Sequence, residues 1–310
     1  MLLIYNIGYK VFFWFKRLRR RFRFFEKVAR LYEYYFSLLL NRKFVSWLVK
    51  HSPKRGLNVK PRDEEYIISL TSFPARISYV HIAIETLMRQ TFKPDCIILW
   101  LAESQFPEKK LPENLTRLES LGLTIRWCDD LRSHKKYHYV LQENPNANII
   151  LADDDIFYPR DMLAVLVKEH KKRPKDIIAS IGAQIHPNLS ALPSTWIAPT
   201  LKKTHFSNKI QAYSGQGTLY PAQCFPKEIF QKKKAIELAA SADDLWLQAM
   251  SLLTHTKTTL IHPRRGFPVN IEILNDQPLF RSNNADGENL NDKIWDRLVR
   301  EYALDQYDEE

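Results

Sequence analysis

Short hydrophobic runs alternate with longer amphipathic segments along most of the chain. Runs rich in Ile and Leu predict buried β-strands, and they span residues 66–71, 96–101, 123–127, 148–152 and 176–180. The segments between them predict helices, which span 79–90, a stretch before Gly122, 134–143 and 159–172. Strands separated by helices are typical of βαβ units, so we expect an α/β fold with a mostly parallel sheet flanked by helices.

Two further elements follow in the second half of the chain. Leu245, Ala249 and Leu252 recur at helical spacing, which predicts a buried helix that begins near Ser241. A β-rich run at 258–262 predicts another strand. The chain shows no internal repeat, and no run of eighteen apolar residues indicates a membrane-spanning helix.

The positive charge is concentrated at the N-terminus. Residues 1–60 hold 15 Lys and Arg against two Glu, a net charge of +13, whereas 61–310 carry a net charge of −2. Aromatic residues are interleaved with these cations, a pattern that suits a helix lying among lipid headgroups. A solvated basic arm, or helices that pack on the body, remain alternatives. Because the body is nearly neutral, we expect no nucleic-acid partner.

These patterns predict three parts. They are a basic, aromatic-rich, membrane-associating helical extension at 1–60, a catalytic body at 61–275, and a helical tail at 276–310. We expect residues 1–50 to bind an anionic membrane surface. The three widely separated cysteines offer neither a disulfide framework nor a metal-binding spacing, which favours a reducing compartment.

Three adjacent carboxylates, Asp153, Asp154 and Asp155, directly follow the fourth predicted strand. In open α/β sheets ligands bind beyond the carboxyl ends of the strands, so this position favours function over a solvated acidic turn. Carboxylates that repel one another need a cation or hydrogen-bond donors nearby to stay ionised. A hard divalent ion that bridges carboxylate and phosphate oxygens would meet this need.

Three other segments are candidates for the same site. Gly215 and Gly217 allow close approach of the backbone to a ligand, although a simple turn explains them equally well. Asp243 and Asp244 open the predicted buried helix, where a carboxylate could act as a general base. A capping box formed by Ser241 and Asp244 is an equal alternative, which explains Asp244 but leaves Asp243 unexplained. His262, at the end of the last strand, could bind a metal or lie in an exposed turn.

The order of these parts resembles that of GT-A fold glycosyltransferases, in particular bacterial family 2-like enzymes of capsule, lipopolysaccharide and other surface-glycan synthesis. The segments that carry the resemblance are ISLTSFPAR at 68–76, QTFKPDCIILW at 90–100, RSHKKY at 132–137, ADDDIFYP at 152–159 and ADDLWL at 242–247. It covers roughly residues 64–265. The Asp triad with its flanks is the most specific of these segments.

The resemblance implies a nucleotide-sugar donor, usually a UDP-sugar, a saccharide or lipid-linked acceptor, and Mn²⁺ or Mg²⁺. It implies metal ligands at Asp155, Asp153 and His262, with His255 a near alternative to His262. It also implies a general base at Asp244 of an inverting enzyme, although Asp243 stands where many members have Glu, which leaves the choice between the two open. The donor-binding positions that it implies are Thr71, Arg76, Asp130, Ser133, Lys135, Asp153, Asp154, Gly215 and Gly217.

We therefore expect a metal-dependent glycosyltransferase, peripheral on the cytoplasmic face of the inner membrane. One alternative is a metal-dependent phosphohydrolase or phosphotransferase that uses the Asp triad. Enzymes with an aspartyl nucleophile usually carry such a motif after their first strand, which argues against this. The other alternative is a non-catalytic, basic membrane-binding relative.

Overall fold

The computed structural model describes Tyr35, Trp47, and residues 50–51, 55–197, 205–261, 269–271 and 289–308. Most of the predicted N-terminal extension, residue His262 and the first part of the predicted tail lie outside these residues. In the part of the chain that is described, no helix is both long enough and apolar enough to cross a membrane.

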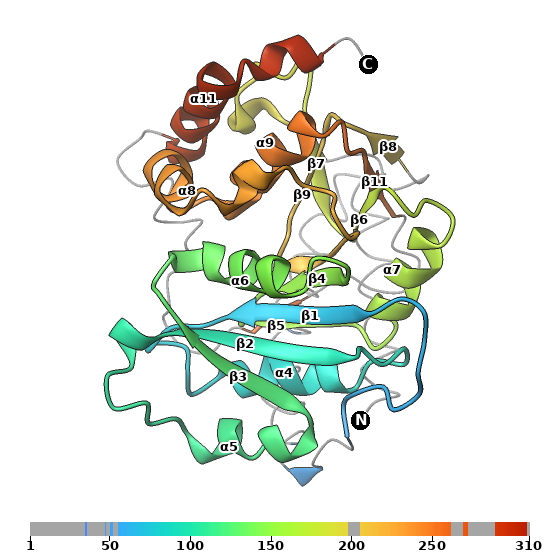
Figure 1. The fold of residues 1–310 in the computed structure, drawn as a ribbon, viewed down its shortest axis with the longest axis vertical. Coiled ribbons are helices and arrows are strands. Elements are labelled where there is room, and N and C mark those ends of the chain that lie inside the picture. The colour runs from blue at the N-terminus through green and yellow to red at the C-terminus, as the bar shows by residue number, and fades with distance from the viewer. Residues whose placement is uncertain are drawn as a thin grey trace.

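A central sheet of eight strands organises the molecule, in the order β3-β2-β1-β4-β10-β6-β11-β8 (Figure 1). Its first half is parallel and consists of β1 (Tyr66–Thr71), β2 (Cys96–Ala102), β3 (Leu123–Cys128) and β4 (Asn148–Ala152). Strands β1, β2 and β4 are buried almost throughout, as expected for a parallel sheet covered on both faces. These four strands confirm the strands predicted from the hydrophobic runs.

The second half of the sheet mixes strand directions. It consists of β10 (Gln216–Tyr220), β6 (Ile177–Ala179), β11 (Thr258–Leu260) and β8 (His205–Ser207). β6 and β11 are parallel to each other, whereas β10 runs antiparallel to both of its neighbours, β4 and β6. The glycine segment expected to be a loop therefore continues directly into an inner strand of the sheet.

Two small ladders accompany the main sheet. β7 (Gly182–Gln184) pairs with β9 (Ile210–Ala212), and β5 (Ile156–Phe157) pairs with β12 (Val269–Asn270). The second ladder holds the chain just after the Asp triad, where the Ile271 amide also donates to the Asp155 carbonyl oxygen at 2.6 Å.

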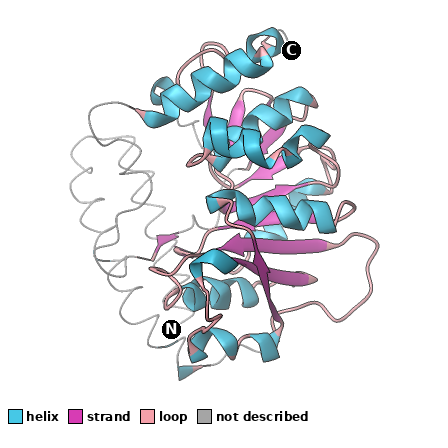
Figure 2. Cartoon of the chain, turned by 60° about the vertical axis from the view of Figure 1, so that its left-hand side comes forward, coloured by secondary structure: helices cyan, strands magenta, loops and turns pink. Residues whose placement is uncertain are grey.

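Helices cover both faces of the sheet (Figure 2). One face packs against α6 (Lys135–Glu143), α8 (Lys232–Ala239), α9 (Asp243–Leu253) and α11 (Leu290–Tyr302). The other packs against α4 (Val80–Met88), α5 (Glu113–Thr116) and α7 (Met162–His170). Single 3₁₀ turns lie at Glu103–Gln105, Glu119–Leu121, Arg132–His134, Pro193–Thr195, Lys227–Phe230 and Leu304–Tyr307. This arrangement confirms the predicted α/β class.

The C-terminal helix α11 packs on the body. Trp295 is fully buried, its indole donates to the Leu189 carbonyl oxygen at 2.8 Å, and Trp196 meets its ring edge-on. Asp292 accepts two hydrogen bonds from Ser194, which tie the start of α11 to the turn before β8. Trp196 thus has a packing role, as does Trp246, which is also fully buried.

Buried histidines predict a pH-dependent stability. Burial lowers the pKa of both His81 and His138 to about 4, so in the folded state these imidazoles stay neutral when the unfolded chain takes up protons near pH 6.5. Their contribution to stability is present above pH 6.5 and is lost as the pH falls toward 4. We expect each to lower the free energy of unfolding by about 1 kcal/mol between pH 7.5 and 5.5.

Urea unfolding at the two pH values measures this effect. His138→Phe removes a titrating group and should reduce the pH dependence. His255→Asn is the matched control, because His255 is exposed and Asn tolerates its left-handed φ of 52°. An unchanged pH dependence in His138→Phe would contradict the assignment.

Candidate functional site

Four segments converge at the carboxyl end of β4. The Asp triad leaves β4 beside the start of β10, where the Asp153 amide donates to the Gly215 carbonyl oxygen at 3.2 Å. The loop after β1 and the starts of α6 and α9 bring further charged side chains to the same place. The topology thus gathers the predicted carboxylates and Gly215 at one edge, where α/β proteins bind their ligands.

Lys136 links the two acidic segments. Its ammonium lies 2.9 Å from Asp153 Oδ1 and 2.9 Å from Asp243 Oδ2, and only 4% of the residue is exposed. Burial alone would lower the pKa of Lys136, but Asp153 and Asp243 outweigh it, and the pKa is raised well above its usual value. Lys136 is therefore a permanent cation between the Asp triad and α9.

The start of α6 is held rigidly against the sheet. The Ser69 hydroxyl on β1 donates to the Lys136 carbonyl oxygen and accepts from the Trp100 indole at 3.0 Å. His134, just before α6, forms a hydrogen bond with the Ala239 carbonyl oxygen at the end of α8, at 2.9 Å. These contacts fix the base of the Lys136 side chain.

Sequence reasoning selected Lys135 and missed Lys136. Lys135 forms an ion pair with Asp130 at 2.8 Å, and Asp130 also accepts from the Arg132 amide and from Gln105. Helical spacing could have identified Lys136, because it lies four residues before the buried Val140, on the same face of α6. A charged residue on the core face of a helix indicates a buried ionic contact.

The three triad carboxylates have different surroundings. Asp154 is buried and accepts from the Ser72 hydroxyl at 2.6 Å and from Arg76 at 2.9 Å. Asp155 accepts from the same Arg76 nitrogen at 2.8 Å and leaves 30% of its side chain exposed, while Asp153 leaves 36% exposed. Asp154 thus anchors Arg76, and Asp153 and Asp155 are the two that can reach a ligand.

Burial and the neighbouring Asp153 charge raise the pKa of Asp155 to about 6. Burial also raises the pKa of Asp154, against the influence of Arg76 and Ser72. Among the described residues the triad therefore has more negative charge than its paired cations neutralise, and an added cation would relieve the repulsion.

Gly215 is required by contact with the triad. A Cβ atom at this position would lie 1.8 Å from Asp153 Oδ2, far inside contact distance. Gly217 has a φ of +84°, and a Cβ there would lie 2.3 Å from Met162 Sδ. The two glycines therefore let β10 pass directly behind Asp153 and α7. Gly215 also lies in a tight turn, in which the Gln216 amide donates to the Tyr213 carbonyl oxygen at 3.1 Å, so the turn and the close approach to Asp153 occur together.

The two carboxylates at the start of α9 are not equivalent. Burial raises the pKa of Asp243, but Lys136, His134 and Ser133 together lower it below its usual value. Burial and the adjacent Asp243 charge raise the pKa of Asp244 to about 7. Asp243 is therefore a fixed anion, whereas Asp244 can exchange a proton near neutral pH.

Ser214 holds both of these carboxylates. Its hydroxyl lies 3.1 Å from Asp243 Oδ2, and its amide donates to Asp244 Oδ1 at 2.9 Å. The predicted capping box is wrong: Ala242 is the N-cap of α9 and no side chain caps the helix. The reason is that Asp244 accepts from Ser214 on β10's leading segment instead of from its own helix. The ring of Tyr213, 38% exposed, precedes Ser214 at this point.

The other predicted residues lie in different settings. Thr71 donates to the Trp100 carbonyl oxygen on the neighbouring strand at 2.8 Å. Asp130 and Lys135 pair with each other beyond β3, while Ser133 lies near Asp243. His255 follows the C-terminal end of the 11-residue helix α9, roughly 16 Å from its acidic start, and its ring lies against that of Tyr307. His262 is outside the described residues.

The described part of the chain holds no group of three or more His, Cys, Asp or Glu side chains arranged to bind a metal. Two exposed carboxylates nevertheless suit Mg²⁺ or Mn²⁺, since such ions are commonly held by one or two carboxylates together with substrate phosphates. The oxygen-only donors and the raised pKa of Asp155 fit a hard divalent cation at Asp153 and Asp155.

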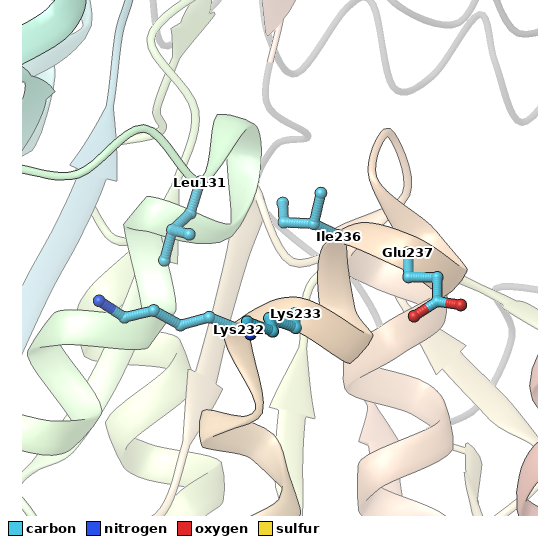
Figure 3. A pocket seen from close by; sticks show the side chains of 5 residues that line it. All are labelled: Leu131, Lys232, Lys233, Ile236 and Glu237. Carbon is cyan, nitrogen blue, oxygen red and sulfur yellow. The ribbon is translucent and has the colours of Figure 1, made fainter.

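A surface pocket lies near this region but apart from the carboxylates (Figure 3). It is formed between the turn before α6 and helix α8, and its lining residues are Leu131, Lys232, Lys233, Ile236 and Glu237. Lys232 at its rim pairs with Asp129 at 3.0 Å. None of the carboxylates at β4 or α9 lines this pocket.

No known protein family and no curated protein matches the chain. Partial similarity is found to residues 1–349 of Staphylococcus aureus TarS in complex with UDP, at 11% identity, with 77% of this chain and 70% of that chain covered and a TM-score of 0.45. The complex of TarS with UDP-GlcNAc gives 12% identity, 77% and 71% coverage, and a TM-score of 0.43. A 4-diphosphocytidyl-2C-methyl-D-erythritol synthase gives 12% identity, 57% and 85% coverage, and a TM-score of 0.36. TM-scores below 0.5 do not identify a fold family, so the fold assignment depends on the strand order described above.

The contact between Gly215 and Asp153 yields a testable prediction. Gly215→Ala should lower the free energy of unfolding by about 1–3 kcal/mol, because its methyl group must displace the Asp153 carboxylate. In an Asp153→Ala background the same substitution should cost much less, since the clashing carboxylate is gone. Urea unfolding of the four proteins of this double-mutant cycle measures the coupling. Equal costs in both backgrounds would show that the two residues do not contact each other.

Proposed function

We propose that the protein is a metal-dependent glycosyltransferase that moves a sugar from a nucleotide-sugar donor, most simply a UDP-sugar, to a saccharide or lipid-linked acceptor of a bacterial surface glycan. The observation that carries the proposal is the juxtaposition of two kinds of carboxylate. Asp153 and Asp155 offer oxygen ligands at the end of β4, and Asp244, across β10, has a pKa of about 7. The motif resemblance to family 2-like enzymes supports the same conclusion.

The donor side of the site would be Asp153 and Asp155. When bound there, Mn²⁺ or Mg²⁺ would stabilise the negative charge that develops on the diphosphate leaving group. Arg76 orients Asp155, and Gly215 leaves room for the Asp153 side chain. Thr71, Asp130, Ser133 and Lys135 remain proposed donor contacts on the strength of the resemblance alone.

The acceptor side would be Asp244. A general base works best when its pKa is close to the working pH, and a pKa of about 7 meets this condition. Asp243 does not, because its carboxylate is tied to Lys136 and held as a stable anion. The structure thus favours Asp244 as the group that removes the acceptor proton, which fits an inverting enzyme.

The N-terminal extension would place this chemistry at a membrane. Its cations and aromatic residues suit an anionic lipid surface, where lipid-linked acceptors are found. We propose that the protein is peripheral on the cytoplasmic face of the inner membrane.

A panel of nucleotide sugars tests the function. The purified protein with Mn²⁺ should bind and slowly hydrolyse one donor, and UDP-GlcNAc belongs in the panel. Asp155→Ala should reduce the Mn²⁺-dependent affinity for that donor at least tenfold, since one of two ligands is lost. Asp305→Ala, which removes an exposed carboxylate from the C-terminal turn, is the control and should change nothing. Cleavage of phosphate esters with no binding of any donor would favour a phosphohydrolase instead.

The general base is tested by two neighbouring substitutions. Asp244→Asn should lower the transfer rate by a factor of about 10² to 10⁴ while the donor affinity stays the same, because the base acts on the acceptor. Asp243→Asn should mainly lower the melting temperature, since it deprives the buried Lys136 of a partner. Retained transfer in Asp244→Asn would exclude it as the base.

A further inference from the structure

The Lys136 ammonium already pairs with one carboxylate of the Asp triad. Of the two triad carboxylates with exposed oxygens, Asp153 accepts a hydrogen bond from Lys136 at 2.9 Å. The stem of Lys136 lies in the core, and its carbonyl oxygen is tied to Ser69. The ammonium therefore cannot leave the site in the way that a surface lysine could.

We propose that Lys136 is a built-in competitor of the divalent cation at Asp153 and that it sets how strongly this site binds the cation. The inference rests on the proposed function, because it concerns the same carboxylates. It names a positioning residue that touches neither sugar nor acceptor in the proposal.

Electrostatics gives the reason. A divalent cation on Asp153 would lie within several ångströms of the Lys136 ammonium, and like charges at that separation repel strongly inside a protein. The cation must therefore either bear this repulsion or displace the ammonium from Asp153. Both lower the affinity of Asp153 for the cation.

Asp243 makes the displacement feasible. Lys136 contacts both carboxylates at 2.9 Å, so an ammonium that gives up Asp153 still has Asp243 as its partner. No uncompensated charge is left in the interior, which would be costly. A shift of the Lys136 ammonium from Asp153 to Asp243 alone would link cation binding at Asp153 to the start of α9.

A purely structural role for Lys136 predicts the opposite sign. If the lysine only held Asp153 in place, its removal would loosen the carboxylate and weaken the binding of a cation. If it competes, removal frees a carboxylate oxygen and binding becomes tighter. The sign of the change therefore distinguishes the two roles.

The experiment measures binding of Mn²⁺ alone to the full-length protein by isothermal titration calorimetry, without a donor. We expect Lys136→Met to bind Mn²⁺ about tenfold more tightly than the unmodified protein, or more. Lys136→Arg, which keeps the charge, should retain the weaker affinity. Lys209→Met is the matched control: Lys209 is a partly buried lysine that pairs with a different carboxylate, Asp308, at 2.8 Å, so its loss should leave the Mn²⁺ affinity unchanged.

Loss of Lys136 could unfold the protein, because Asp243 would be left buried without a cation. Circular dichroism checks this, and the Lys136→Met/Asp243→Asn double variant removes both charges. Compared with Asp243→Asn alone, it should again bind Mn²⁺ more tightly. Equal or weaker binding in folded Lys136→Met than in the unmodified protein, or in the double variant than in Asp243→Asn, would overturn the proposal, as would the failure of every variant to bind Mn²⁺.

These outcomes are distinct from failure of the proposed function. Tighter binding of Mn²⁺ by Lys136→Met, together with no binding of any nucleotide sugar by the unmodified protein, would uphold the competition and reject the glycosyltransferase. Donor turnover by the unmodified protein, with no effect of Lys136→Met on the Mn²⁺ affinity, would uphold the glycosyltransferase and reject the competition.

Discussion

The burial of one ammonium group between two acidic segments is the constraint on which the site depends. Carboxylates crowd at the carboxyl end of β4 and the start of α9, and within the described residues the cations paired with them are Lys136 and Arg76. The carboxylates are Asp153, Asp154, Asp155, Asp243 and Asp244. Burial, and then the charge of a neighbouring carboxylate, raise the pKa of Asp155 to about 6 and that of Asp244 to about 7, and burial raises the pKa of Asp154 as well. The proposed cation and the proposed proton transfer would both use this crowding of carboxylates, which by itself disfavours folding.

The sequence was sufficient for the parallel half of the sheet. Its strands are continuous hydrophobic runs, as strands buried on both faces must be, and the helices between them follow the helical period. The position of the Asp triad followed from the same rule, since parallel strands place their carboxyl ends at one edge. In this half of the sheet the local hydrophobic pattern agrees with the overall fold, so the pattern alone predicts the strands.

The antiparallel part could not be predicted in the same way. β10 contains Gly217 and begins beside Gly215, so local propensity indicates a loop, whereas tertiary contact makes the segment an inner strand between β4 and β6. The roles of Asp244 and of Lys136 are likewise decided by partners distant in sequence, Ser214 for Asp244 and Asp243 for Lys136. No spacing rule within a single helix contains that information.

The contacts of α6 connect the proposed donor side of the site with the proposed acceptor side. Lys136 lies in the first turn of α6, and His134 immediately precedes this helix. His134 is hydrogen-bonded to Ala239 in the last turn of α8, and the chain runs from α8 directly into α9, which begins at Asp243. Helix α6 is thus connected to the start of α9 in two ways. One connection is the ion pair of Lys136 with Asp243, and the other is the His134–Ala239 hydrogen bond together with the backbone that follows α8. A movement of Asp153 that drew Lys136 along would be resisted by the His134–Ala239 contact, so the ammonium can change its partner only by a small shift. Because the backbone around it is held in place while the ammonium can shift, Lys136 could transmit the binding of a cation at Asp153 to Asp243 without a large rearrangement.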